Sequence, residues 1–256
     1  MPEVFFDLRL GERVLFDEGR IAAVIRAVAA EEVLLEINRA RARGSRLVAD
    51  KGINLPDSDL RTPALTAKDI EDLAFAAGHA DIVNYSFVSR ESDIEALRRS
   101  LERDGREDLA LILKIETRRA FLNLPRLLLM AMRQGSPLGV MIARGDLAIE
   151  CGWEALAEIQ EEILRICAAA HVPCIWATQV LDTMAHHGRP TRAEITDAAM
   201  GARAGAVMLN KGPNITAAVR TLRAIASRNA PQRRERTEPL LACVAFRSNC
   251  EPSPHL

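Results

Sequence analysis

Short apolar runs alternate with amphipathic stretches through most of this sequence, and their lengths predict strands and helices in turn. Runs typical of buried strands lie at 81–88, 109–116, 138–143, 173–178 and 205–210. Stretches with apolar residues at helical spacing lie at 67–78, 91–103, 119–133, 153–170, 191–203 and 214–227. The strand centres recur roughly every 30 residues, the length of a βα unit. Buried strands with helices between them predict a parallel sheet with covered faces.

The first fifty residues have a different pattern, which predicts short strands joined by tight turns. Segments rich in Val, Ile and Leu lie at 13–17, 21–28 and 32–37, and a fourth strand is expected at 44–48. The Asp-Glu-Gly sequence at 17–19 has hairpin-turn chemistry, whereas 51–56 breaks the strand pattern.

These patterns divide the chain into a β-rich unit at 1–55, a βα unit at 56–227 and a tail at 228–256 that is expected to be mostly disordered. Two helices begin with capping-box sequences, Thr66 with Asp69 and Thr191 with Glu194.

Two architectures fit the βα unit: an open, doubly wound sheet and a (β/α) barrel. No strand is followed by G-x-G-x-x-G, and no G-x-x-x-x-G-K-[ST] occurs, so a dinucleotide or P-loop site lacks its fingerprint. A barrel needs eight strands, and the pattern predicts five.

Composition narrows the possible functions. Hydrophobic residues make up 48% of the sequence and charged residues 27%. The net charge is −1, so the protein has no overall positive charge that would attract nucleic acid or an anionic membrane. Seven Phe, two Trp and one Tyr are too few for a single-strand stacking platform. No apolar run is long enough for a transmembrane helix. Five cysteines without a C-x-x-C pair favour a reducing cytoplasm over a disulfide framework or structural zinc.

Polar residues gather where the predicted parallel strands end. The first strand ends at Ser86, the second at Lys114 and Glu116, the third at 144–146 (Arg-Gly-Asp) and the fourth at Thr178. Barrel enzymes keep their active sites at this carboxyl rim. Lys114 and Glu116 are two residues apart, so their side chains share one face of the strand.

A lysine beside two carboxylates predicts chemistry on an anion that is held by a metal ion. Magnesium takes one or two protein carboxylates and leaves its other positions to water and substrate oxygens, and Glu116 with Asp146 fits that number. Lys114 would stabilise a transferring phosphoryl group or a developing enolate. The sequence at 144–146 predicts a helix start, whose free N–H groups suit a carboxylate or phosphate, and Gly145 would allow close approach.

Each of these residues also has an ordinary structural explanation. Lys114 could simply pair with Glu116, Asp146 could cap a helix, and Thr178 could be a strand-end hydroxyl. Trp176 is expected in the core. His186 and His187 are expected to be solvated in a loop beside Gly188. The arginines at 39–46 and 228–236 are expected to be solvated rather than to bind nucleic acid.

Several segments resemble the pyruvate kinase family, in the family's order and spacing. They lie at 51–56, 65–73, 114–116, 141–147, 177–184, 189–194 and 207–209, and the match runs from about residue 10 to about 225. The resemblance implies a (β/α)8 TIM-type barrel, here with about five βα units after a β-rich lid-domain remnant. It also implies phosphoryl transfer between phosphoenolpyruvate and ADP, giving pyruvate and ATP, with Mg²⁺ (or Mn²⁺) and usually K⁺.

The resemblance also assigns roles to individual residues. Lys114 resembles the lysine that stabilises the moving phosphoryl group, and Glu116 and Asp146 resemble the metal ligands. The backbone at 144–146, from Arg144 through Gly145, would hold the substrate carboxylate. Thr178 would sit beside the enolate carbon. Asp17 resembles the lid aspartate that faces the cleft. Ser86, at the end of the first parallel strand, is a further candidate substrate-binding residue.

The sequence departs from the family pattern in its missing parts. The family's first three or so βα strands, with their phosphate-binding arginine and K⁺-site residues, have no counterpart here, nor has the C-terminal regulatory domain. Three explanations remain open: a piece of a longer protein, a chain that pairs with another chain or copy to complete the barrel, and a homologue that binds without catalysing. An Mg²⁺-dependent pyruvate or enolate lyase is a further functional alternative.

Overall fold

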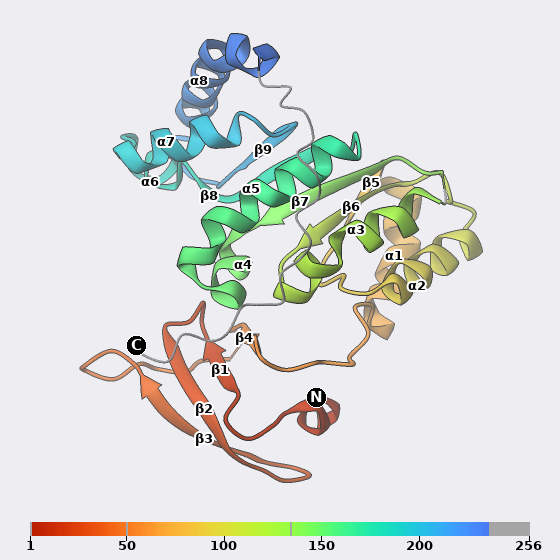
Figure 1. Cartoon of the computed structure of the whole chain (residues 1–256), viewed down its shortest axis with the longest axis vertical. Helices are drawn as coiled ribbons and strands as arrows, with labels where there is room; N and C mark the ends of the chain where they lie inside the picture. The colour runs from red at the N-terminus through yellow and green to blue at the C-terminus, as the bar shows by residue number, and fades with distance from the viewer. Residues whose placement is uncertain (1, 50, 134, 236–256) are drawn as a thin grey trace.

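The computed structural model describes residues 2–49, 51–133 and 135–235 and contains two separate sheets (Figure 1). One is a four-stranded antiparallel sheet in the order β3-β2-β1-β4, which we call the small sheet. Its strands are β1 (Arg13–Phe16), β2 (Ile21–Val28), β3 (Val33–Arg39) and β4 (Ile53–Asn54). A 3₁₀ helix, η1 (Pro2–Asp7), precedes it.

The second sheet has five parallel strands in sequence order, β5-β6-β7-β8-β9, and we call it the parallel sheet. Its strands are β5 (Ile82–Tyr85), β6 (Ala110–Ile115), β7 (Leu138–Ala143), β8 (Cys174–Val180) and β9 (Ala206–Leu209). The helices are α1 (Ala67–His79), α2 (Glu91–Arg103), α3 (Arg118–Met132), α4 (Arg144–Cys151), α5 (Trp153–Ala169), α6 (Asp182–His187), α7 (Arg192–Gly201) and α8 (Ile215–Glu235). Alternating strands and helices form a half-barrel, so the fold is a partial TIM-type barrel with an additional antiparallel sheet.

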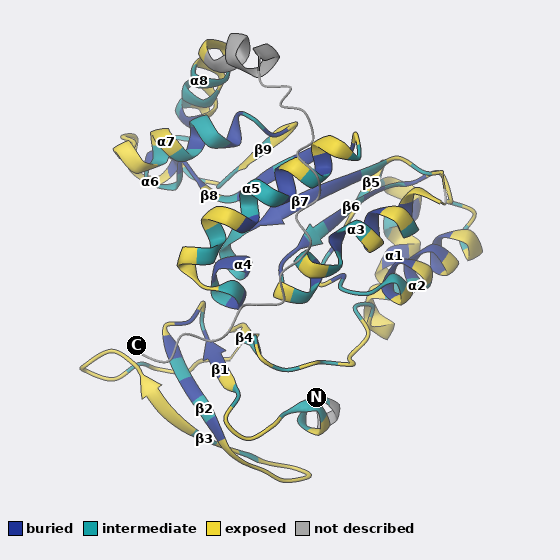
Figure 2. Ribbon diagram, viewed as in Figure 1, coloured by how far each residue is buried: buried dark blue, intermediate teal, exposed yellow. Residues whose placement is uncertain are grey.

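The main core lies between the parallel sheet and its helices, and Figure 2 shows the central strand β7 buried along most of its length. Leu111, Leu113 and Ile115 of β6 are fully buried, and Leu124 and Leu127 of α3 belong to the same core. Strand β7 is buried at five successive positions, as expected for a strand covered on both faces. The small sheet has a second, smaller core around Ile25.

The predicted elements that depend on local chemistry are confirmed. All five parallel strands are present in the expected order. Both capping boxes form, with Thr66 and Thr191 accepting hydrogen bonds from the amides of Asp69 and Glu194. The turn after β1 has positive φ at all three positions of 17–19, the conformation that a tight hairpin requires. Trp176 is fully buried, as predicted.

Two predictions about local structure are wrong. Segment 44–48 forms no strand, because Gly44 has φ +84° and the chain there lies exposed without a pairing partner. The fourth strand is instead β4, inside the segment that was expected to break the pattern, and it pairs with β1. His186 and His187 lie in helix α6 rather than in a loop, and Gly188, with φ +78°, ends that helix.

Helix α8 continues to Glu235, beyond its predicted end at 227. The rest of the predicted tail, 236–256, lies outside the described residues. Among the residues that are described, no helix is long and apolar enough to cross a membrane.

The packing of α7 against β8 makes a testable prediction. A Cβ at Gly201 would lie 2.6 Å from Cδ1 of Trp176, which is fully buried and has no room to move. Gly201→Ala should therefore lower the free energy of unfolding by about 1–3 kcal/mol, measured by urea denaturation.

Gly78→Ala in α1 is the matched control, since a Cβ there meets no atom within 4 Å. It should leave stability unchanged or raise it by up to about 1 kcal/mol. Equal effects of the two substitutions would contradict the packing argument.

Candidate active site at the carboxyl ends of the parallel strands

The ends of β5 and β6 bring three predicted site residues together. The Lys114 ammonium lies 2.8 Å from Oε1 of Glu116 and donates a 2.7 Å hydrogen bond to Oγ of Ser86. Glu116 is 3% exposed, and the Lys114 side chain is 25% exposed. The lysine therefore does pair with Glu116, and it reaches the end of the neighbouring strand as well.

The turn after β5 supports this arrangement. Phe87 has φ +57°, a conformation that bulky residues rarely adopt, and its amide donates a 2.6 Å hydrogen bond to Oε2 of Glu116. Both carboxylate oxygens of Glu116 are thus held, one by a cation and one by a backbone amide. A strained backbone held by its surroundings is a feature of functional sites.

Asp146 lies in the first turn of α4, which begins directly after β7 as predicted. Burial raises the pKa of the Asp146 carboxyl, and the negative charge of Glu116 raises it further. Lys114 acts in the opposite direction, and Glu18 of the small sheet adds a further raising contribution. Asp146, Glu116 and Lys114 therefore share one electrostatic environment across the ends of β6 and β7.

This environment fits a divalent cation. Two carboxylates that repel each other, with one lysine compensating only in part, leave negative charge that a metal ion would neutralise. Within the described residues no group of three or more His, Cys, Asp or Glu side chains could hold a metal by itself. A site with two carboxylates leaves the other positions of a metal ion to water and substrate.

Thr178 lies at the end of β8 on an unusual backbone. Thr178, Gln179 and Leu181 all have positive φ, and pairing with β9 is interrupted between Trp176 and Val180. A β-branched residue at φ +67° is a clear outlier. The Thr178 hydroxyl accepts a 3.0 Å hydrogen bond from the amide of Gly145, so this bend brings the hydroxyl to the start of α4.

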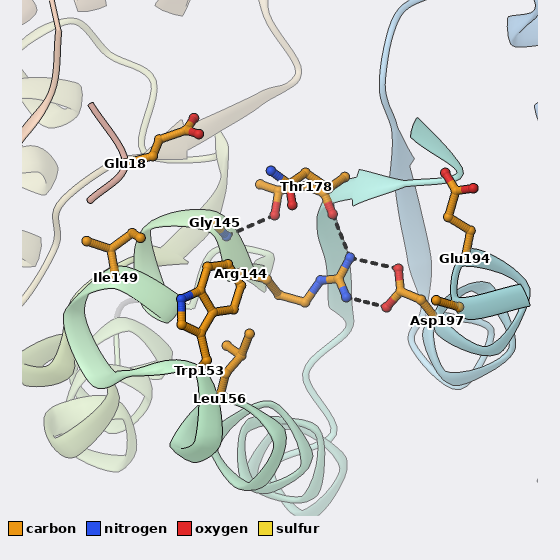
Figure 3. A pocket seen from close by; sticks show the side chains of 11 residues that line it. Glu18, Arg144, Gly145, Ile149, Trp153, Leu156, Thr178, Glu194 and Asp197 are labelled. Carbon is orange, nitrogen blue, oxygen red and sulfur yellow. Dashed lines mark hydrogen bonds and ion pairs between the residues drawn. The ribbon is translucent and has the colours of Figure 1, made fainter. Parts of the chain in front are cut away.

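The Arg144 side chain holds this bend from behind (Figure 3). Its Nε donates to the carbonyl of Ala177 at 2.8 Å, and its Nη2 donates to the carbonyl of Thr178 at 2.5 Å. The same guanidinium forms a two-pronged ion pair with Asp197 of α7 and lies 4.6 Å from the ring centroid of Trp176. Trp176 also donates to Asp197, at 3.2 Å. Arg144 thus acts through its side chain on β8 and α7, away from the amides at the start of α4.

The structure does not bring Asp17 to this cluster. Its carboxylate pairs within the small sheet region with Lys51 at 3.0 Å and Arg20 at 3.2 Å, and the hydrogen bond from Lys51 lowers its pKa. The neighbouring Glu18 lines a pocket of about 280 Å³ beside Gly145 and Thr178 (Figure 3).

Sequence analysis missed Glu18, Asp197 and Glu150 as residues near the site. Asp197 follows the capping residue Glu194 by three positions on α7, and nothing in that spacing indicates that it receives Arg144. Glu18 and Asp17 are adjacent acids in one turn, and the sequence does not distinguish which of them faces the barrel.

Comparison with known proteins gives this geometry a family. The sequence model described as pyruvate kinase, barrel domain, matches residues 1–215. The chain belongs to the pyruvate kinase family. The sequence similarity to curated pyruvate kinases covers most of this chain.

A pyruvate kinase of Mycobacterium tuberculosis is 36% identical over 84% of this chain and 45% of its own length. A pyruvate kinase of Clostridium acetobutylicum is 32% identical over 77% of this chain and 40% of its own. Pyruvate kinase PKLR of Rattus norvegicus is 34% identical over 77% of this chain and 33% of its own. The chain therefore spans less than half the length of these pyruvate kinases.

The contacts of Arg144 predict that lysine cannot replace it. Arg144→Lys loses the planar fork that binds Asp197 and two carbonyls at once, and the side chain is only 12% exposed. The free energy of unfolding should fall by about 2–4 kcal/mol in a denaturant titration. Arg165→Lys, at an exposed position of α5, should change it by less than about 0.5 kcal/mol. Similar losses for both would contradict the special role of Arg144.

The raised pKa of Asp146 predicts a pH-dependent stability difference. The folded state favours the protonated carboxyl, so wild-type stability falls as pH rises above the ordinary value of 3.8 and through the raised pKa. Asp146→Asn carries no such charge and should gain in Tm relative to wild type over that range.

Thermal melts from pH 4 to pH 8 measure this difference, with Asp72→Asn on the exposed face of α1 as the control. A Tm difference for Asp146→Asn that does not grow with pH would contradict the assigned electrostatics.

Proposed function

We propose that this chain carries the phosphoenolpyruvate and metal half of a pyruvate kinase active site. The reaction is phosphoryl transfer between phosphoenolpyruvate and ADP, giving pyruvate and ATP. The observation that carries the proposal is the position of Lys114, between Ser86 and Glu116 and within the electrostatic reach of Asp146. A phosphoryl group bound near Glu116 and Asp146 would lie beside the Lys114 ammonium, which would stabilise the negative charge that develops during transfer.

In the proposed reaction a terminal oxygen of ADP bonds to phosphorus as the bridging oxygen of phosphoenolpyruvate leaves. The enolate that remains takes a proton at carbon to become pyruvate. Such a transfer has a loose transition state, so it depends on charge and positioning more than on covalent catalysis. Lys114 would stabilise the moving phosphoryl group, and Ser86, which holds the ammonium, would contact substrate beside it.

Glu116 and Asp146 would hold the divalent ion, Mg²⁺ or Mn²⁺, which supplies positive charge to the substrate oxygens when bound. K⁺ is expected from the family as a second ion. The repulsion that Glu116 exerts on Asp146 supports the metal assignment, because a cation would relieve it.

The start of α4 would bind the substrate carboxylate through the amides of Arg144, Gly145 and Asp146, with the Gly145 amide exchanging the Thr178 hydroxyl for a carboxylate oxygen. The Thr178 hydroxyl already accepts a hydrogen bond from Gly145, so it would lie beside that carboxylate and the adjacent enolate carbon. The Arg144 side chain contributes by keeping Thr178 in its strained conformation.

We further propose that residues 1–55 act as a lid over the barrel unit at 56–227, with Asp17 turning toward the cleft when the lid closes. Its carboxylate would first leave Lys51 and Arg20. Cytoplasmic location is part of this proposal, since the reaction belongs to central metabolism.

The open edge of β5 is where further βα units would bind. Among the described strands β5 pairs only with β6, and a cavity of about 1780 Å³ runs beside it. Ile82 and Phe87 are 52% and 58% exposed there. An exposed parallel edge with apolar neighbours favours pairing. We propose that a complementary βα segment, from a second polypeptide, another copy or further sequence, covers this edge.

No observation on the described residues favours the enolate-lyase or non-catalytic alternatives. ADP-dependent release of pyruvate supports the kinase, whereas ADP-independent release would indicate the lyase.

The role of Lys114 makes a direct prediction. Lys114→Met should lower kcat by about 10²–10³-fold or more in a coupled pyruvate assay, because the charge that stabilises the moving phosphoryl group is lost. Lys68→Met, on the exposed face of α1, should leave kcat unchanged. The assay is run on the chain alone and with an added N-terminal βα fragment of a related pyruvate kinase.

Mn²⁺ binding, followed by electron paramagnetic resonance, tests the site independently of turnover. Lys114→Met should retain Mn²⁺, whereas Glu116→Gln and Asp146→Asn should each weaken it at least about tenfold. Unchanged turnover in Lys114→Met, or Mn²⁺ binding that survives both acid substitutions, would refute the proposed site.

A further inference from the structure

The parallel sheet ends at β9, and this edge is uncovered. Strand β9 is the last in the strand order, so among the described strands it pairs only with β8 (Figure 1). Its sequence, Ala-Val-Met-Leu, is as apolar as that of an inner strand, yet its positions alternate between exposed and intermediate, and Met208 is 39% exposed. An edge strand presents a row of backbone N–H and C=O groups with which another strand can pair.

The helix that follows β9 is also incompletely covered. Helix α8 packs against β9, α6 and α7, and its Ala218 is fully buried. The next residue, Val219, is 49% exposed. In a parallel sheet a connecting helix covers both the strand before it and the strand after it. Exposed apolar positions on β9 and on α8 therefore fit a further strand beside β9.

The tail after α8 was expected to be mostly disordered, but it contains one run with the character of such a strand. Residues 240–246, Leu-Leu-Ala-Cys-Val-Ala-Phe, are all apolar and lie between Pro239 and Arg247. Strands that are buried on both faces of a parallel sheet have unbroken apolar runs, and proline is tolerated where a strand begins. The run lies outside the described residues.

The position of this run along the chain matches the βα repeat. The run starts at residue 240, 31 residues after β9 ends at 209, and β8 starts at 174, 31 residues after β7 ends at 143. Helix α8 ends at Glu235, and residues 236–239 can span up to about 13 Å, more than the roughly 10 Å between packed layers. A right-handed crossover through a helix commonly places the next strand beside the one before it.

We propose that residues 240–246 form a sixth parallel strand, which pairs with the open edge of β9 and has α8 as its crossover. This strand would bury apolar surface of β9 and α8 and would close one of the two open edges of the parallel sheet. The edge at β5 stays available to the complementary βα segment. The inference does not depend on the proposed reaction, because it concerns only the edge of the sheet.

Two cysteines in the same tail give the test an internal control. Cys243 lies in the middle of the run, whereas Cys250 lies beyond it. In the native full chain iodoacetamide should label Cys243 at least about tenfold more slowly than Cys250, because a thiol in a paired strand reacts only when the strand opens. Cys167 of α5, which is 1% exposed, gives the rate of a protected thiol. Peptide mass spectrometry measures these rates, and urea should remove the differences between them.

A substitution within the run tests where it binds. Val244→Asp places a charge in the middle of the run, and Ser248→Asp, beyond the run, is the matched control. Val244→Asp should raise the labelling of Cys243 to the rate of Cys250 and should speed hydrogen exchange of β9 at least about threefold, because its outer edge is uncovered. Ser248→Asp should change neither. Exchange in β5 should stay the same in both variants, and faster exchange in β5 instead of β9 would overturn the assignment to the β9 edge.

Labelling of the wild-type chain decides the inference even if Val244→Asp fails to fold. Equal labelling of Cys243 and Cys250 in the native chain would overturn it. Protection of Cys243 that does not change on dilution supports pairing within one chain. Protection that is lost on dilution would show that the run pairs with another copy, and would overturn the strand within one chain. These measurements need neither substrate nor metal, so failure of the proposed reaction would leave them unaffected.

Discussion

One guanidinium determines the shape of the candidate site. Arg144 begins α4, yet its side chain extends sideways to hold two carbonyls at the bend of β8 and the carboxylate of Asp197 on α7. Those contacts, together with the hydrogen bond from the Gly145 amide, oppose the strain of the left-handed backbone at Thr178. The same residue therefore provides an amide at the start of a helix and the support that brings Thr178 to it.

Charge and strain here work against stability. Asp146 and Glu150 are both acids whose pKa values are raised chiefly by burial, and both lie on a single two-turn helix. Phe87 and Thr178 have positive φ, a left-handed backbone conformation that bulky and β-branched residues rarely adopt. Costs of this kind concentrate at functional sites, where they are tolerated because a ligand offsets them. The rest of the parallel sheet follows ordinary rules, with apolar strands and capped helices.

Local signals were enough to predict most of the fold. Capping boxes at Thr66 and Thr191 and the turn at 17–19 are determined by neighbouring residues, so the sequence indicates them directly. Predictions failed where a distant partner decides: β4 is a strand because β1 pairs with it, whereas 44–48 has no such partner. Lys114 and Glu116 were predictable from their spacing. The role of Asp197 was not predictable, because it depends on a backbone bend at Thr178 and Gln179 that these residue types do not indicate.

The separations along the chain have a consequence for the order of folding. Lys114 reaches Ser86 over 28 residues, and Arg144 reaches Thr178 over 34, so each contact joins strands that are neighbours in both sequence and space. Asn54 reaches Glu150 only over 96 residues. Loop closure costs more entropy as the separation grows, and contacts of short range form earlier. The contacts around the candidate site should thus form at a lower entropic cost than the docking of the small sheet, which joins segments that lie farther apart along the chain.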